Sequence, residues 1–151
     1  MKRECERPTM TRYDSIMLSV TKATGNVGEL AIASDLVNQG YDVFFPYGDV
    51  SHIDIIAVKE NQVVKLQAKT VKSSKKGTVC LSHFTNRRSG LRYTTRNIDY
   101  MALYVIDRKV VAYVSMSEIE GHTTSFSLRF DPPKNGQRKG IKYFNDYLSV
   151  V

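Results

Sequence analysis

The order of apolar and polar residues predicts a single-sheet domain of the α/β or α+β class. One long helical pattern comes first, a run of β-branched and aromatic segments follows, and a weaker helical pattern comes late in the chain. The 151 residues suit one domain, and 42% hydrophobic with 25% charged residues is a globular composition. We therefore expect one domain over residues 1–151, with residues 1–20 as a flexible extension because they carry no apolar pattern.

The first predicted element is a helix that ends near Gly40. Thr24 or Asn26 can cap its start, Glu29 then falls in the first turn, where the helix dipole favours an anion, and Gly40 suits the left-handed position after the last turn. The periodicity that predicts this helix comes from apolar or small residues at helical spacing, namely Val27, Leu30, Ala31, Ser34 and Val37.

Strands are predicted after this helix, where β-branched and aromatic residues gather between turn residues. Two hairpins are expected, one turning at Glu60-Asn61 and one at Asp107-Arg108. A short helix capped by Ser115 or Ser117 follows the second hairpin, residues 131–140 form a loop, and residues 143–148 suggest a terminal helical turn. The predicted strands are residues 41–45, 53–58, 62–69, 99–106, 109–114 and 124–130.

The first hairpin brings three polar side chains together. Asp54 and Gln67 lie equally far from the centre of the Glu60-Asn61 turn, so we expect them to lie opposite each other. Lys69 shares a strand face with Gln67 because residues two apart point the same way. Asp54 stands among isoleucines, where a carboxylate needs a partner, and either a metal ion or the Lys69 ammonium would serve.

Glu29 on a helix, Asp54 at a hairpin strand and Gln67-Ala68-Lys69 on the next strand resemble the pattern of the PD-(D/E)XK nuclease superfamily. The resemblance implies a restriction-endonuclease-like core, an α/β fold with a mixed central β-sheet flanked by helices. Within the superfamily the chain is most similar to the PD-(D/E)XK type of group I intron-encoded homing endonuclease, which also has Gln where most relatives have an acid.

This resemblance implies a site-specific, metal-dependent double-strand DNA endonuclease with Glu29, Asp54, Gln67 and Lys69 as catalytic residues. Asp54, Glu29 and Gln67 would ligate Mg²⁺ through oxygen atoms, and Lys69 would orient the attacking water or stabilise the phosphorane. A homotetramer is implied, and at least a dimer is needed to cut both strands at a palindrome-like site. Alternatives are a Holliday-junction-type structure-specific nuclease, or a non-catalytic DNA-binding relative, which the neutral Gln67 favours.

A long basic segment indicates contact with nucleic acid. Residues 69–98 contain eight Lys and Arg and no Asp or Glu, whereas the whole chain has a net charge of +7. A second basic loop lies between Asp131 and Asp146. The predicted DNA-binding residues, some of which have side chains suited to base edges, are Lys72, Lys75, Lys76, Asn86, Arg87, Arg88, Arg92, Tyr93 and Arg96.

Composition also limits the cellular setting. Two cysteines cannot build a disulfide framework, and no apolar stretch reaches the length of a membrane span or a signal-peptide core. We expect a cytoplasmic protein with no membrane partner. Among the three histidines, His52 is expected to neighbour the site, with no ligand role.

Overall fold

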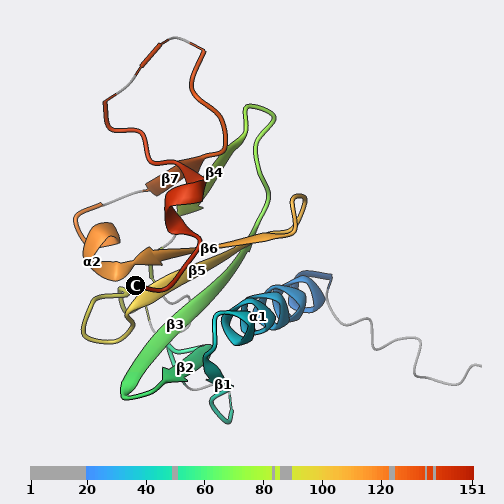
Figure 1. The fold of residues 1–151 in the computed structure, drawn as a ribbon, viewed down its shortest axis with the longest axis vertical. Helices are drawn as coiled ribbons and strands as arrows, with labels where there is room; N and C mark the ends of the chain where they lie inside the picture. The colour runs from blue at the N-terminus through green and yellow to red at the C-terminus, as the bar shows by residue number, and fades with distance from the viewer. Residues whose placement is uncertain are drawn as a thin grey trace, which may run out of the picture.

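The computed structural model describes residues 20–48, 51–82, 84–85, 90–122, 125–134, 136–137 and 139–151. Its elements follow the predicted order of one long helix, a run of strands and short helices late in the chain (Figure 1). They are α1 (Val20–Asn38), β1 (Asp42–Phe44), β2 (Ile55–Lys59), β3 (Gln62–Val71), β4 (Thr78–Ser82), β5 (Tyr100–Val105), β6 (Val110–Ser115), α2 (Met116–Ile119), β7 (Ser125–Arg129) and the 3₁₀-helix η2 (Phe144–Tyr147).

The central sheet is mixed. Its strand order is β1-β2-β3-β5-β6, with β3 and β5 parallel and the other neighbours antiparallel. A separate antiparallel pair consists of β4 and β7. Figure 1 shows α1 alongside the long strand β3, whereas the β4–β7 pair lies toward the top of the view. This arrangement is the α/β fold with a mixed central sheet that the resemblance implied.

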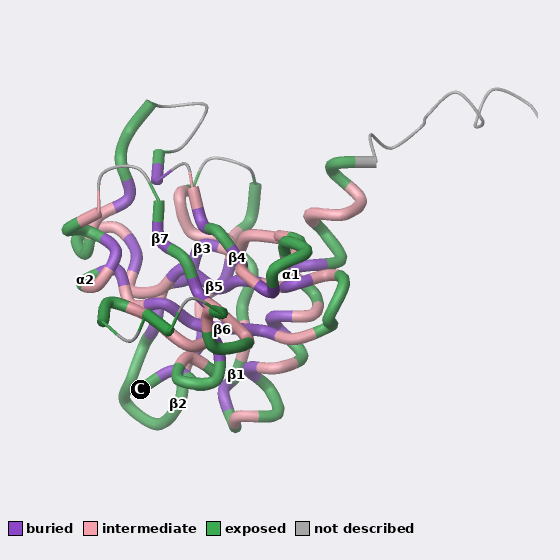
Figure 2. The backbone as a smooth tube through the Cα atoms, turned by 90° about the horizontal axis from the view of Figure 1, so that it is seen from above, coloured by how far each residue is buried: buried purple, intermediate pink, exposed green. Residues whose placement is uncertain are grey.

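Two apolar clusters lie on the two faces of the central sheet. One joins Ile32 and Leu36 of α1 to Leu66 of β3 and its neighbours. The other joins β4 and β7 to the opposite face of β5, where Met101 and Leu103 point. The purple segments of Figure 2 trace this interior through the strands and along α1. Each face of β3 therefore meets a different layer, which decides where its polar side chains point.

Helix α1 begins earlier than expected. It starts at Val20, so Thr24 and Asn26 lie inside the helix and do not cap it, and Glu29 lies mid-helix rather than in the first turn. The predicted end is confirmed, because Gly40 has a φ of 86° and its N–H donates to Val37 O at 2.9 Å. The following residue, Tyr41, donates to Leu36 O at 3.1 Å, which completes a Schellman motif.

The periodicity that predicted α1 belongs to its solvent side. Leu30 and Val37 are 64% and 58% exposed, whereas the buried face carries Ile32 and Leu36 at 0%. Gly28 also belongs to the buried face, and a Cβ built on it would lie only 1.9 Å from Thr70 Oγ1. The helix is thus apolar on two sides, and the absence of a side chain at Gly28 lets it approach β3 closely.

The hairpin register is confirmed. Ile55 pairs with Leu66, and Lys59 with Gln62, so the turn at Glu60-Asn61 is centred as predicted. The other predicted strands begin or end one or two residues from their expected bounds, and residue 124 of the last one lies outside the described residues. Strand β4 was not predicted. Ser115 holds the N-cap position of α2 without a capping hydrogen bond, since its hydroxyl pairs with that of Ser117 at 2.8 Å.

Among the described residues, no helix is both long enough and apolar enough to span a bilayer.

Candidate active site

Asp54 lies directly before β2 and is held by β3. Its backbone N–H donates to Leu66 O at 2.9 Å, which extends the hairpin ladder by one step. Its carboxylate Oδ2 accepts the backbone N–H of Ala68 at 2.8 Å and the side-chain amide of Gln67. The predicted meeting of Asp54 and Gln67 across the hairpin is therefore confirmed, and a backbone donor that the sequence did not reveal fixes the carboxylate as well.

Gln67 is the only buried polar or charged side chain among the described residues, at 7% exposed. Its Nε2 donates to Asp54 Oδ2 and, at 3.4 Å, to the carbonyl of Ala68. Burying an amide costs free energy unless its polar atoms find partners. In the described part of the chain, every buried side-chain N or O atom has one.

Lys69 lies on the same face of β3 as Gln67. In the parallel register with β5, Gln67 pairs with Met101 and Lys69 with Leu103, so both point to the face covered by the β4–β7 layer. The Lys69 ammonium lies 5.6 Å from the centroid of the Tyr93 ring. Carboxylate, amide and ammonium thus share one face, as the sequence predicted.

Tyr93 differs from its predicted role. It was expected on a surface that reads DNA bases, but it is only 3% exposed, and its backbone N–H donates to Phe84 O at 2.8 Å. His52 packs edge-on against the Tyr93 ring, with centroids 6.3 Å apart, which places this histidine beside the site as expected. Because burial removes Tyr93 from contact with DNA, we correct its assignment to a packing partner of Lys69.

Glu29 lies on α1, the helix that packs on the other face of β3. It is half-buried on α1, next to Gly28, which abuts Thr70 directly after Lys69 in the chain. Thr70 Oγ1 also donates to Thr24 O at 3.3 Å, so this part of α1 is attached to the carboxyl-terminal end of β3. The structure joins Asp54 to Gln67 and places Lys69 on the same face of β3, and the participation of Glu29 stays a prediction.

The residues present suit a hard cation in their chemistry. The predicted donors are the carboxylates of Asp54 and Glu29 and the amide oxygen of Gln67, and oxygen ligands are those that Mg²⁺ prefers. Within the described residues, no group of three or more His, Cys, Asp or Glu side chains gathers around a potential metal position. Metal binding at this site would therefore depend on the Gln67 amide in addition to the carboxylates.

Most predicted DNA-binding residues that the structure describes are exposed. Lys72, Lys75 and Lys76 follow β3, and Arg96 is exposed in the connection before β5. Arg92 is exposed but anchored, because its guanidinium donates to the carbonyl of His122 and lies 5.8 Å from the Phe84 ring centroid. Asn86, Arg87 and Arg88 lie outside the described residues.

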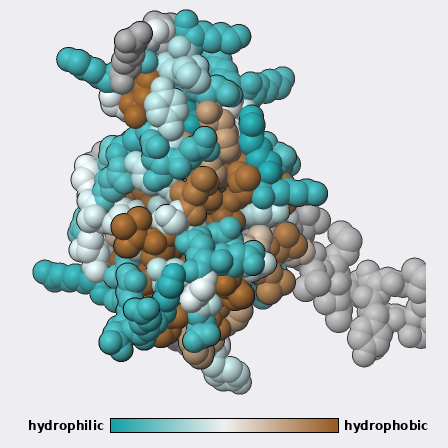
Figure 3. All heavy atoms as spheres, viewed as in Figure 1, coloured by the Kyte–Doolittle hydropathy of each residue, from teal (hydrophilic) through white to brown (hydrophobic). Residues whose placement is uncertain are grey.

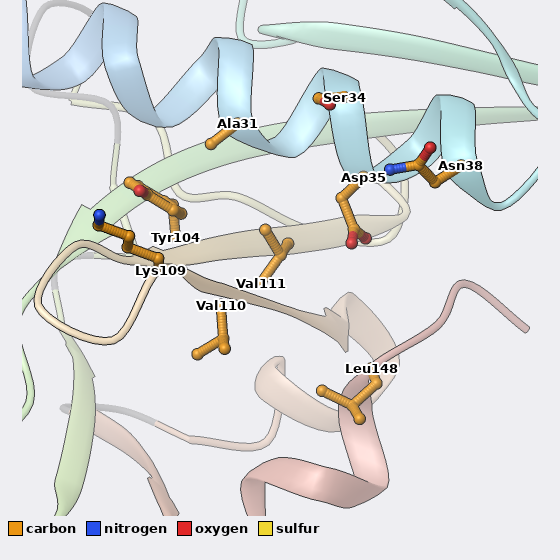
Figure 4. Close-up of a pocket in the computed structure, with 9 residues that line it drawn as sticks. All are labelled: Ala31, Ser34, Asp35, Asn38, Tyr104, Lys109, Val110, Val111 and Leu148. Carbon is orange, nitrogen blue, oxygen red and sulfur yellow. The ribbon is translucent and has the colours of Figure 1, made fainter.

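A groove lies between α1 and β6, and the acidic side chain that lines it already has partners within the protein. Its volume is about 440 Å³, and Figure 4 shows Asp35 pointing from α1 toward the strands. The Asp35 carboxylate accepts the Tyr113 hydroxyl and the Gln39 amide, each at 2.7 Å. Burial and this hydrogen bond raise the pKa of Tyr113 well above its ordinary value, so the phenol stays protonated and links the helix to the sheet.

Known proteins identify the family. The PD-(D/E)XK endonuclease family model matches residues 19–150. The structure is similar to that of the bacterial homing endonuclease I-Ssp6803I, with a TM-score of 0.63 and 23% identity over 79% of this chain and 80% of that one. It also matches the Holliday junction resolvase Hjc of Archaeoglobus fulgidus, with a TM-score of 0.44 and 17% identity over 70% of this chain and 83% of that one. No curated protein matches the chain. From the family match, the chain belongs to the PD-(D/E)XK endonucleases and is a nuclease of that type.

Proposed function

We propose that this nuclease is a site-specific, Mg²⁺-dependent double-strand DNA endonuclease of the homing type. The observation that carries the proposal is the pairing of Asp54 with Gln67 on the strand face that also presents Lys69. Similarity in fold to a bacterial homing endonuclease supports the same assignment. The expected reaction hydrolyses a phosphodiester bond and leaves a 5′-phosphate and a 3′-hydroxyl.

Each side chain has a role that suits its position. Asp54, Gln67 and Glu29 would hold the divalent cation, which supplies charge neutralisation at the phosphate and acidifies a water molecule. The Ala68 N–H keeps the Asp54 carboxylate in place. Lys69 would orient the attacking water or donate to a phosphate oxygen as negative charge develops. Tyr93 holds the ammonium on this face, so that less reorganisation is needed during the reaction.

The test is DNA cleavage with and without Mg²⁺, in wild type and in Asp54→Ala. We expect the substitution to abolish Mg²⁺-dependent cleavage of plasmid and genomic DNA while duplex affinity stays within about threefold, because the anchoring cations are unaffected. Asp42→Ala, which removes an exposed carboxylate from β1, is the matched control and should cut normally. Undiminished cutting by Asp54→Ala would remove Asp54 from the mechanism.

A non-catalytic DNA-binding relative is the second candidate, and the neutral Gln67 favours it. Two formal negative charges in place of three weaken the attraction for a divalent cation. This candidate predicts duplex binding without cleavage at any Mg²⁺ concentration. Adding four-way junctions to the same assay tests the third possibility, a structure-specific nuclease, which would cut junctions in preference to linear duplex.

A further inference from the structure

A basic pocket lies beyond the end of β3 that carries Lys69. Its volume is about 620 Å³, and it is formed by the β3–β4 turn, the β5–β6 turn and the segment after β7. The upper end of the surface in Figure 3, where the segment after β7 lies, is mostly hydrophilic. The charged side chains that line the pocket are Lys75, Lys76, Arg108, Arg129, Lys134 and Asp131.

The charge balance of the basic pocket favours an anion. Five cations against one carboxylate leave a formal surplus of four positive charges. Within the described residues none of the five cations forms an ion pair, whereas Lys142 of the neighbouring loop pairs with Glu118. Gathering like charges in one concavity costs electrostatic free energy, which a bound anion would offset.

Two arginines of the basic pocket are held by protein contacts. The Arg108 guanidinium lies 4.3 Å from the Phe130 ring centroid, and its Nε donates to Ser73 Oγ at 3.4 Å. Arg129 Nε donates to the carbonyl of Asp131 at 3.2 Å. Because stacking and hydrogen bonding already restrict both side chains, binding an anion costs them little further conformational entropy.

The turn that carries the two lysines is also fixed. Ser74 Oγ accepts the N–H groups of Lys76 at 3.3 Å and Thr78 at 3.2 Å, and Gly77 has a φ of 68°. Ser73 donates both its backbone N–H and its hydroxyl to Asp107, and these hydrogen bonds hold the pKa of the Asp107 carboxyl below its ordinary value. The Asp107 carboxylate thus links the β5–β6 turn to the β3–β4 turn.

We propose that the basic pocket binds a backbone phosphate of the DNA, at a position separate from the phosphate that is cut. This inference rests on the proposed function for its choice of ligand. Lys75 follows Lys69 by six positions, so their Cα atoms are at most about 22 Å apart. A duplex whose scissile phosphate lies near Lys69 thus has other backbone phosphates within reach of the pocket.

The experiment measures duplex affinity by fluorescence anisotropy without Mg²⁺, so that no cleavage interferes. The test variant combines Lys75→Gln with Lys134→Gln, two exposed lysines that are dispensable to the contacts described above. The control combines Lys59→Gln with Lys65→Gln, which removes the same charge near the opposite end of β3. Thermal unfolding of both variants verifies that they fold.

We expect the test variant to bind duplex at least about tenfold more weakly than the control near 0.1 M salt. The slope of log affinity against log salt should fall by about two, since each phosphate-contacting lysine contributes about one. Equal losses in the two variants would overturn the proposal, because the pocket would then contribute only to the general positive field. Tight saturable binding of inorganic phosphate, with duplex affinity unaffected in the test variant, would also overturn it and identify a small-anion site.

Failure of the proposed function gives a different result. If wild type never cleaves DNA but the test variant still binds duplex more weakly than the control, the pocket assignment stands and the catalytic assignment falls. If cleavage proceeds and the two variants bind alike, the catalytic assignment stands and the pocket assignment falls.

Discussion

A buried aromatic ring, that of Tyr93, lies beside the Lys69 ammonium. The contact with Tyr93 is a cation–π interaction, which contributes about 0.5–2 kcal/mol depending on solvent exposure. Removing the ring while keeping an apolar side chain should therefore leave the lysine present but less well positioned. A reaction that depends on this ammonium would slow without any loss of DNA binding.

We predict that Tyr93→Leu lowers the single-turnover cleavage rate by about threefold to thirtyfold, while duplex affinity changes little. Tyr93→Phe keeps the ring and should retain most of the rate. Thermal unfolding measures the separate cost of altering a buried residue. A Tyr93→Leu enzyme that cuts at the wild-type rate would show that Lys69 needs no aromatic partner.

Gln67 offers a second test at the scale of one side chain. We predict that Gln67→Glu remains competent and reaches half-maximal cleavage at a lower Mg²⁺ concentration, because an added carboxylate strengthens the attraction for the cation. Without metal, two carboxylates in contact repel each other, so the melting temperature should fall in EDTA and recover in Mg²⁺. Gln62→Glu, at the exposed start of β3, should show neither effect. A Gln67→Glu protein that folds but ignores Mg²⁺ would count against a metal at this position.

At the scale of elements, the approach of α1 to β3 depends on one glycine. We predict that Gly28→Ala destabilises the fold by about 1–3 kcal/mol, because the new methyl would overlap Thr70 Oγ1. Adding Thr70→Ala should recover part of this loss, since the next contact, with the Thr70 Cβ, is at 3.2 Å. Gly25→Ala, which has nothing within 4 Å, should instead stabilise the helix by about 0.5–1 kcal/mol. Chemical denaturation of the three variants and of wild type measures these differences, and equal effects of Gly28→Ala and Gly25→Ala would refute the close contact.

The elements also show what the sequence could and could not predict. The register of β2 and β3 was predictable because a short turn fixes it locally, and three of the four predicted catalytic positions lie on that hairpin or directly beside it. The start of α1 was misplaced because residues that resemble caps occur inside it. Its buried face was hidden because Leu30 and Val37 repeat at helical spacing on the exposed side.

Contacts between distant segments had no local signal. The parallel pairing of β3 with β5 crosses the whole basic segment, so it depends on tertiary packing rather than on a turn. Tyr93 precedes β5 and contacts Lys69 across the fold, whereas its place in the basic segment had suggested contact with DNA. Arg108 lies beside the β3–β4 turn, where its Nε donates to Ser73. Arg129 lies beside the same turn because it pairs with Thr78 of β4.

For the whole molecule, the number of predicted active sites decides how many copies must act on one DNA target. Each chain has a net charge of +7 and one predicted site. One active site cuts one strand, so cleavage of both strands at a symmetric target requires at least two copies related by symmetry. We predict that sedimentation velocity at cleavage-competent concentrations detects a dimer or tetramer. Mixing wild type with Asp54→Ala should then yield nicked plasmid. A monomer that makes double-strand breaks in one binding event would rule out this arrangement.

Strand β3 presents its alternate residues to two different layers, with Ala68 and Thr70 toward α1 and Gln67 and Lys69 toward the candidate site. A shift of the pairing by one residue would exchange the two faces of the strand, so that the Gln67 amide and the Lys69 ammonium would point toward α1. Any redesign of target preference should therefore leave this strand and its hairpin untouched. The surface turns beyond Val71 can be varied without disturbing that alternation, so they are the place to begin.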